Sequence, residues 1–198
     1  MPTSLRISTF SGSQIAGFVP DVAKLRIEVF REYPYLYEGS LDYESEYLLS
    51  YARTERSVFV IASDGEEVVG VSTGLPMSDA DLDFQKPFEA AGLDIGSVFY
   101  FGESVLRSEY RGSGVGSRFM RERESFARAL GGFRFCTFCA VQRSGDDPRK
   151  PIGYQDLGGF WRKYGFEERP DLETRFSWKE VGAEAERENR MRFWIKPL

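Results

Sequence analysis

The chain has 198 residues, 41% of them hydrophobic and 29% charged, which is the composition of a globular protein of single-domain size. Its net charge of −5 argues against the broad basic surface that sequence-independent nucleic-acid binding requires. It contains no histidine, which excludes Ser-His-Asp catalysis and histidine-ligated metal sites within the chain.

The first half of the chain predicts two helices and three strands. Apolar residues alternate in some segments and recur at helical spacing in others. Asp64-Gly65 separates two runs rich in valine, which is a strong signal for a tight hairpin. The predicted elements are a strand at 5–10, helices at 22–32 and from Asp42 onward, and hairpin strands at 58–63 and 67–75.

The second half of the chain predicts four strands and two helices. A polar connection rich in Asp and Pro precedes them, and a glycine interrupts the first strand. The predicted elements are strands at 97–107, 133–142, 174–180 and 191–196, a helix at 115–130, and a short helix ending at Tyr164. The sequence therefore predicts a mixed α/β (α+β) fold, with one domain over residues 1–198, a mostly antiparallel sheet of six to seven strands and about four helices.

No segment has the pattern of a signal peptide or of a membrane span. The first 25 residues lack a basic start followed by an apolar stretch, and no run of 18 apolar residues occurs. We therefore expect a cytoplasmic protein without a membrane partner.

Cys136 and Cys139 form a C-x-x-C inside a strand-like run. Residues three apart in a strand point to opposite faces, which disfavours a redox pair or half of a zinc site. We expect two buried structural thiols instead.

A glycine-rich turn lies between the strand at 97–107 and the helix at 115–130. Glycines let a ligand approach the backbone, and the free N–H groups of a helix start attract anions, so this turn predicts a phosphate site. A Walker A loop would end in Gly-Lys-Ser/Thr, and a Rossmann fingerprint would have glycine where Ser117 stands. The turn is Arg111-Gly112-Ser113-Gly114-Val115-Gly116.

The pattern Arg/Gln-x-x-Gly-x-Gly/Ala is matched by Arg111, Gly114 and Gly116, and here the chain resembles the GCN5-related N-acetyltransferases (GNAT). The segment Phe160-Trp161-Arg162-Lys163-Tyr164-Gly165-Phe166 is similar to the closing helix and glycine of that family, and the hairpin falls where the family has one. The resemblance implies acetyl-CoA as co-substrate, without a metal, and a sheet in which the strand at 97–107 splays from its neighbour.

The resemblance also places the donor. The pantetheine arm would bind the backbone of Val105 and Leu106, with Ser104 close to the thioester carbonyl, where an N–H group can stabilise an oxyanion. The pyrophosphate would lie on the turn from Arg111 to Ser117. Arg149-Lys150 could reach the 3′-phosphate of CoA, or their segment, 143–153, could be a solvated loop.

Glu103 is the first candidate for the general base that takes a proton from the acceptor amine. It follows Gly102, where a strand can bulge, and alternation places Phe99, Phe101 and Val105 on its face, which would desolvate the carboxylate. The alternative is a buried glutamate paired with an arginine. Tyr100, expected on the other face, is the second candidate.

The proton donor to the leaving thiolate departs from the family pattern. The position that often holds a tyrosine is Trp161, whose indole N–H is too weak an acid, so we expect Trp161 to pack against the pantetheine or acetyl end. Tyr164, Tyr154 and water are the remaining candidates. The asparagine that the family carries ahead of this helix is also missing, with Tyr154 near its place.

The resemblance assigns acceptor recognition to the segment between the first two helices, whose aromatic and acidic residues would suit a cationic amine. These residues are Tyr33, Tyr35, Tyr37 and Glu38. The expected activity is transfer of acetyl to a primary amine of a small molecule or peptide. A non-catalytic CoA-binding module, favoured by Trp161, and a Rossmann-type oxidoreductase, disfavoured by Ser117, are the alternatives. The oligomeric state stays open, with a homodimer as one alternative.

Overall fold

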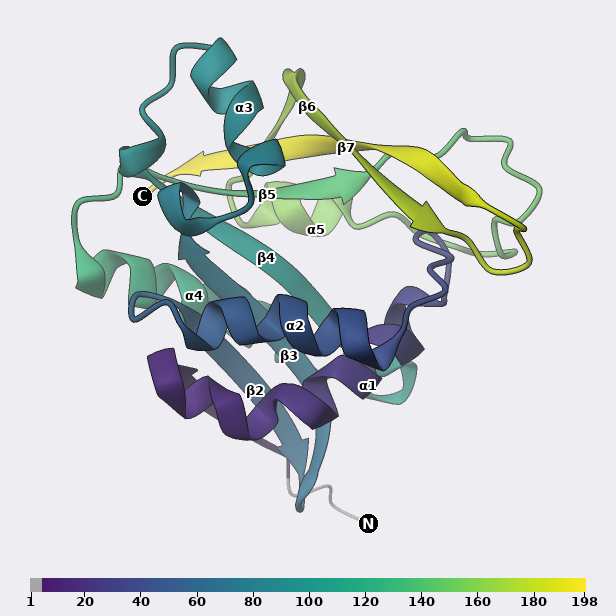
Figure 1. The fold of residues 1–198 in the computed structure, drawn as a ribbon, viewed down its shortest axis with the longest axis horizontal. Helices are drawn as coiled ribbons and strands as arrows, with labels where there is room; N and C mark the ends of the chain where they lie inside the picture. The colour runs from purple at the N-terminus through teal and green to yellow at the C-terminus, as the bar shows by residue number, and fades with distance from the viewer. Residues whose placement is uncertain (1–4) are drawn as a thin grey trace.

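The structure is a computed structural model that describes residues 5–198 (Figure 1). Within these residues, seven strands and five α-helices follow one another, joined by turns and short 3-10 helices. In order they are β1 (Leu5–Ser11), α1 (Val19–Phe30), α2 (Leu41–Ala52), β2 (Val58–Asp64), β3 (Glu67–Pro76), α3 (Leu82–Ala90), β4 (Val98–Leu106), α4 (Val115–Leu130), β5 (Phe135–Val141), α5 (Gly158–Lys163), β6 (Glu167–Lys179) and β7 (Glu186–Pro197).

The seven strands form one sheet in the order β1-β2-β3-β4-β5-β7-β6. Every neighbouring pair is antiparallel except β4 and β5, which run parallel. The predicted hairpin of β2 and β3 is confirmed, and Gly65 in its turn has a φ of 62°, a value that favours glycine. The predicted mixed α/β fold with a mostly antiparallel sheet is therefore confirmed.

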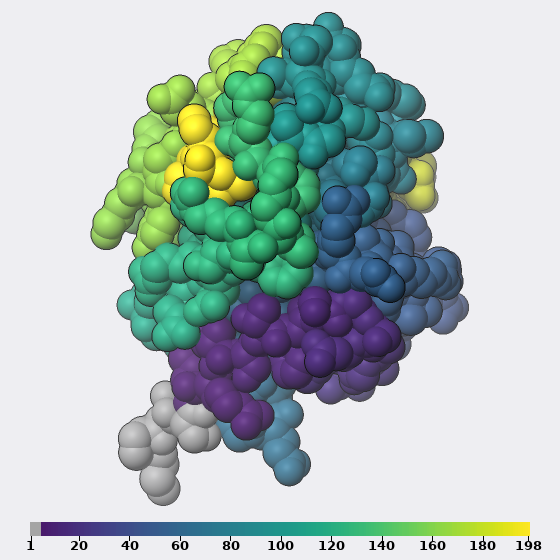
Figure 2. Space-filling view, turned by 90° about the vertical axis from the view of Figure 1, so that its left-hand side faces the viewer, coloured from purple at the N-terminus to yellow at the C-terminus, as the bar shows by residue number. Residues whose placement is uncertain are grey.

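The two parallel strands separate after a short paired stretch. Among the described residues, β4 and β5 pair only from Val98 to Tyr100 with Phe135 to Thr137, and this confirms the predicted splay. The gap beyond these pairs is called the β4–β5 opening below. Figure 2 shows the opposite, closed end of the molecule, where the end of β7 lies against the segment after α4 and Leu198 N donates to Arg134 O at 2.9 Å.

Helices cover both faces of the sheet (Figure 1). Helices α1, α2 and α3 contribute to the apolar core on one face, and α4 and α5 pack on the other. Cys139 belongs to the first core and Cys136 to the second, and both thiols are buried, as the spacing predicts. In residues 5–198, no helix has the length and apolar character that a membrane crossing needs.

Helix α3 is an element that the sequence analysis missed, because it lies in the polar connection between β3 and β4. Its N-cap Asp81 accepts a hydrogen bond from Asp83 N at 2.8 Å. Its inner face carries Phe84, which packs on Tyr100 and Phe176 with ring centroids 4.7 and 4.6 Å apart. Phe84 and Phe88 thus pack the helix on the sheet, although its other residues are mostly polar.

Candidate functional site

Strand β4 carries a β-bulge at its centre. Between the pairs Ser72–Ser104 and Gly74–Phe101, the single residue Thr73 of β3 faces both Gly102 and Glu103 of β4. A Cβ at Gly102 would collide with the hydroxyl groups of Tyr51 and Thr73, so only glycine fits. This confirms that the strand bulges at Gly102, and residues 102–103 are called the β4 bulge below.

The bulge changes the face to which Glu103 points, and two expectations are wrong for this reason. Glu103 lies on the α1 and α2 side with Val105, whereas Phe99 and Phe101 belong to the core on the opposite face. Tyr100 shares the face of Glu103 instead of lying on the other one. The extra residue in the bulge inverts the strand alternation on which both expectations rested.

Glu103 is 6% exposed and contacts both α1 and α2. Its Oε2 lies 2.6 Å from Nη1 of Arg26 and accepts a hydrogen bond from the Tyr47 hydroxyl at 3.3 Å. Its Oε1 is buried and has no hydrogen-bond partner among the described residues. The contacts of Glu103 are thus those of a buried, arginine-paired glutamate, with one oxygen left unpartnered.

Arg26 joins Glu103 to a second buried carboxylate, because its Nε donates to Oε2 of Glu44, which is fully buried on α2. Burial alone would lower the pKa of Arg26, but the charge of Glu103, followed by Tyr47 and Glu44, raises it well above the usual value. One guanidinium is therefore shared by two buried carboxylates at this place.

Tyrosine hydroxyls surround the same region. Those of Tyr47 and Tyr51 lie 3.0 Å apart, and that of Tyr100 lies 3.5 Å from Sγ of Cys139. Burial raises the pKa of Tyr47, Tyr51 and Tyr100, so these phenols keep their protons at neutral pH. A phenol that stays protonated donates a hydrogen bond and does not accept a proton, which favours Glu103 over Tyr100 as a base.

The glycine-rich turn, residues 111–116 and called the phosphate loop below, leads into the first turn of α4. Gly112 and Gly114 have φ values of 75° and 90°, which favour glycine, and Gly114 is the N-cap. Arg111 Nε donates to Leu106 O at 3.1 Å, and Nη2 lies 2.8 Å from Oε2 of Glu32. The predicted phosphate site is thus a helix start that is tied back to the end of β4.

Helix α5 packs beside the start of α4. A Cβ at Gly116 would lie 3.5 Å from Phe160, on whose ring Tyr164 packs at 5.0 Å. Trp161 lies with its ring centroid 5.0 Å from those of Phe138 and of Trp194. These residues belong to the face opposite Glu103, so the candidate acid Tyr164 and the candidate base Glu103 lie on opposite sides of the sheet.

A pocket of about 480 Å³ adjoins the phosphate loop. Its lining residues come from the ends of three segments and are Glu32, Tyr33, Arg111, Pro151, Ile152, Gly153 and Tyr154. The rings of Tyr33 and Tyr154 meet edge to face at 4.8 Å. Tyr33, which the sequence analysis groups with acceptor residues, therefore lies beside Arg111.

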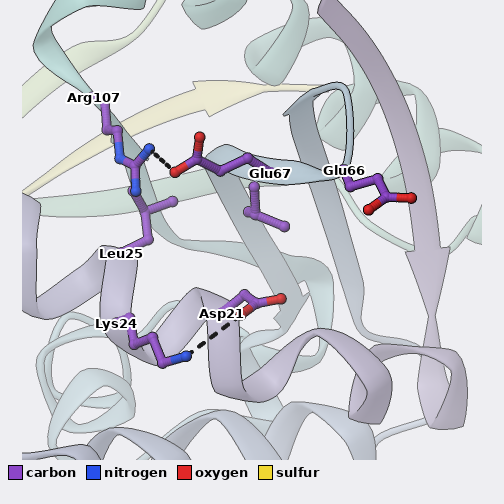
Figure 3. Close-up of a pocket in the computed structure, with 7 residues that line it drawn as sticks. Asp21, Lys24, Leu25, Glu66, Glu67 and Arg107 are labelled. Atoms are coloured by element: carbon purple, nitrogen blue, oxygen red, sulfur yellow. Dashed lines mark hydrogen bonds and ion pairs between the residues drawn. The ribbon is translucent and has the colours of Figure 1, made fainter.

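A second hollow of about 270 Å³ lies between α1 and the turn of the β2–β3 hairpin (Figure 3). Four of its charged side chains form two pairs, with Lys24 3.8 Å from Asp21 and Arg107 2.5 Å from Glu67. Lys24, Asp21 and Glu67 are exposed, and neither Glu103 nor the phosphate loop lines this hollow. We therefore place the candidate site at the β4 bulge.

The remaining acceptor candidates lie where the α1–α2 connection meets β6. Tyr35 packs against Phe30 and Trp178 with centroids 4.6 and 6.0 Å apart. Burial, and then the charge of Glu44, raises the pKa of Tyr37. Glu38 is exposed and lies 3.2 Å from Lys179. Tyr35 is thus partly buried against the core, and Glu38 lies at the surface.

The 143–153 segment is anchored by ion pairs. Arg143 donates to Pro34 O at 2.6 Å and Tyr35 O at 3.0 Å, and it lies 2.6 Å from Glu180. Arg149 is held by Asp147 at 2.7 Å and by Glu180. Both Arg149 and Lys150 are exposed, but the ion pairs of Arg149 hold it to Asp147 and Glu180.

Three charged residues of the site escaped the sequence analysis: Arg26, Glu44 and Arg123. Each has a signal in the sequence, because each stands at a core position of an apolar helix stripe. Arg26 is four residues after Val22, Glu44 four before Leu48, and Arg123 four after Phe119. In residues 5–198, no group of three or more His, Cys, Asp or Glu side chains could hold a metal ion.

Solved structures with the same fold are numerous. Ribosomal-protein-alanine N-acetyltransferase from Brucella melitensis is 16% identical, with a TM-score of 0.64 over 98% of this chain and 99% of the other. A putative acetyltransferase from Acinetobacter baylyi is 11% identical, with a TM-score of 0.63 over 100% and 95%. NAA60 of Arabidopsis thaliana in complex with acetyl-CoA is 11% identical, with a TM-score of 0.62 over 98% and 99%.

A comparison with curated proteins finds no match. The family described as acetyltransferase (GNAT) matches residues 22–150, which is well over half of the chain and includes the β4 bulge and the phosphate loop. The protein therefore belongs to the GNAT family of acetyltransferases.

Proposed function

We propose that the protein is a single-domain N-acetyltransferase that transfers acetyl from acetyl-CoA to a primary amine of a small molecule or peptide. The observation that carries this proposal is the β4 bulge, which brings Glu103 to the edge of the β4–β5 opening. Fold neighbours named as ribosomal-protein-alanine and phosphinothricin N-acetyltransferases support an amine acceptor.

The donor site has two parts. The helix start at Gly114 offers free N–H groups and a partial positive charge to the pyrophosphate of CoA. Beyond Tyr100, the backbone of β4 on the side of β5 is available to the pantetheine arm, and Ser104 is exposed there. The residues present therefore fit acetyl-CoA.

The acceptor nitrogen must lose a proton when it attacks the thioester carbon. Arg26 and Tyr47 hold one oxygen of Glu103 and fix its orientation, while Oε1 has no hydrogen-bond partner in the described chain. Oε1 is the proposed proton acceptor, acting directly or through one water. Tyr164 is the proposed proton donor to the thiolate, with water as the alternative.

A non-catalytic CoA-binding module is the second candidate, because Trp161 stands at the position of the usual acid. Release of CoA thiol from acetyl-CoA, measured across a panel of primary amines, separates the two. We expect amine-dependent release that Gly114→Glu abolishes, since this change sets a side chain and a negative charge against the pyrophosphate. Acetyl-CoA binding by calorimetry without amine-dependent release would establish the module instead.

A further inference from the structure

Arg123 on α4 is a buried cation on the face of the sheet opposite Glu103. Its side chain is 2% exposed, and its guanidinium lies over the ring of Phe101 at 4.3 Å. Within residues 5–198, no carboxylate forms an ion pair with it. Burial lowers the pKa of Arg123 to about 9, so the side chain still carries its charge at neutral pH.

Two of the hydrogen bonds that Arg123 donates go to the β4 bulge, and the others go to Phe119 O and Met120 Sδ of its own helix. Its Nη1 donates to the carbonyl oxygens of Thr73 and Glu103, each at 3.3 Å. These are the residues that face each other across the bulge. Burying an unpaired charge is costly, and an apolar side chain would pack in this core without that cost. Because Nη1 of Arg123 donates to two carbonyl oxygens of the bulge, we infer that the positive charge of Arg123 has a role at the bulge.

The carbonyl of Glu103 belongs to the same peptide group as the N–H of Ser104. In a trans peptide these two groups point in opposite directions. Arg107 N donates to Val69 O on β3. Because backbone groups alternate in direction along an antiparallel strand, the N–H of Val105 points to β3 and the N–H of Ser104 points to the β4–β5 opening. Ser104 N–H therefore points to the place proposed for the thioester.

We propose that Arg123 is a positioning residue that fixes the β4 bulge and polarises the Glu103–Ser104 peptide toward the thioester carbonyl. A cation bound to the carbonyl oxygen withdraws electron density and makes the N–H of that peptide a stronger donor. This inference rests on the proposed acetyltransferase function.

Arg123 acts through the Ser104 N–H group during the attack of the amine on the thioester. As the amine nitrogen bonds to the thioester carbon, the C=O π pair moves onto oxygen, and Ser104 N–H stabilises the negative charge there. The electron pair then re-forms the C=O bond and the C–S bond breaks. The amine proton goes to Glu103, and the thiolate takes a proton from Tyr164 or from water. The products are the amide and CoA thiol, and Arg123 itself neither gains nor loses a proton.

The test uses full-length Arg123→Met, which keeps the volume and removes the charge, with Arg128→Met as control. Arg128 is an exposed residue of the same helix that pairs with Glu124. We expect Arg123→Met to lower kcat by about tenfold or more, since loss of an entire oxyanion donor costs about 10²–10³. The KM for acetyl-CoA, its Kd by calorimetry and the Tm should stay close to wild type, and the control should be normal.

A spectroscopic readout separates polarisation from a structural role. In difference infrared spectra of acetyl-CoA labelled with ¹³C at the carbonyl, the bound carbonyl stretch should lie at a lower frequency in wild type than in Arg123→Met. If the methionine variant fails to fold, Arg123→Gln, which keeps a neutral donor, replaces it with the same expectations. A folded variant with kcat within twofold of wild type, or with an unshifted carbonyl band, overturns the inference. Absence of acetyl-CoA turnover in wild type would instead contradict the proposed function.

Discussion

Nη1 of Arg26 on α1 lies 2.6 Å from Oε2 of Glu103 on β4, in a region where both side chains are almost completely buried. The pair links the helical layer to the bulged strand, and Glu44 shares the same guanidinium. Glu103, the proposed base, is therefore held in place by Arg26 of the helical layer. Because one cation contacts two buried carboxylates, we expect Arg26 to contribute both to the stability of the fold and to the placement of the proposed base.

Arg26→Met should destabilise the protein, because it leaves two buried carboxylates without their cation. Removing one partner of a buried ion pair costs about 3–5 kcal/mol, so the free energy of unfolding in urea should fall by this order. Lys24→Met is the matched control, since Lys24 is an exposed residue of the same helix. A Tm equal to that of wild type would show that the pair carries no net stabilisation.

Glu32→Gln should strengthen acetyl-CoA binding. Arg111 is bound by Glu32 at the mouth of the pocket beside the phosphate loop, so the pyrophosphate has to compete with a carboxylate for the guanidinium. Both side chains are about half exposed, so the gain should be severalfold at low salt and smaller at high salt. Calorimetry with Glu28→Gln as control measures it, because Glu28 pairs with Arg107 instead. Weaker binding by the Glu32 variant would mean that Glu32 supports the site.

Neither cysteine should react with iodoacetamide in the native protein at pH 8. Burial raises the pKa of Cys136 and of Cys139 to about 12, so the reactive thiolate is scarce as well as shielded. Intact-mass spectrometry should show no adduct before denaturation and two after it. Rapid native labelling of Cys139 would indicate that the region around Tyr100 opens in solution.

Much of the fold could be predicted because its signals are local. The β2–β3 hairpin depends on one turn and two alternating strands, and α4 depends on a glycine start and an apolar stripe, so both were found within about a residue. Helix α3 has only a short apolar stripe, because Phe84 and Phe88 are the two large apolar residues that it packs on the core. Strands β6 and β7 begin several residues before their predicted starts, at Glu167 and Glu186. Cross-strand ion pairs such as Arg192–Glu168, at 3.0 Å, involve residues of these extensions, and alternation of apolar residues does not reveal them.

The site could be predicted only in part, for a similar reason. The phosphate loop is a contiguous motif, and Gly102 marks the bulge within its own strand. The partners of Glu103 come from other elements, and the bulge reverses the face on which they lie. A sequence can mark Arg26 and Arg123 as charges on apolar stripes, but which carboxylate or carbonyl they meet depends on the packing of helices on the sheet.

The measurement that tests this account most directly is the turnover of Glu103→Gln, with the best acceptor from the amine panel and saturating acetyl-CoA. Glu44→Gln is the matched control, because Glu44 binds the same arginine but lies on α2. Glutamine keeps the shape of Glu103 but cannot take a proton, so kcat should fall by about 10²–10⁴-fold at neutral pH. The Kd for acetyl-CoA should remain unchanged, and the control should lose much less. Near-normal turnover by Glu103→Gln, in a folded protein that binds acetyl-CoA, would contradict the assignment of Glu103 as the base.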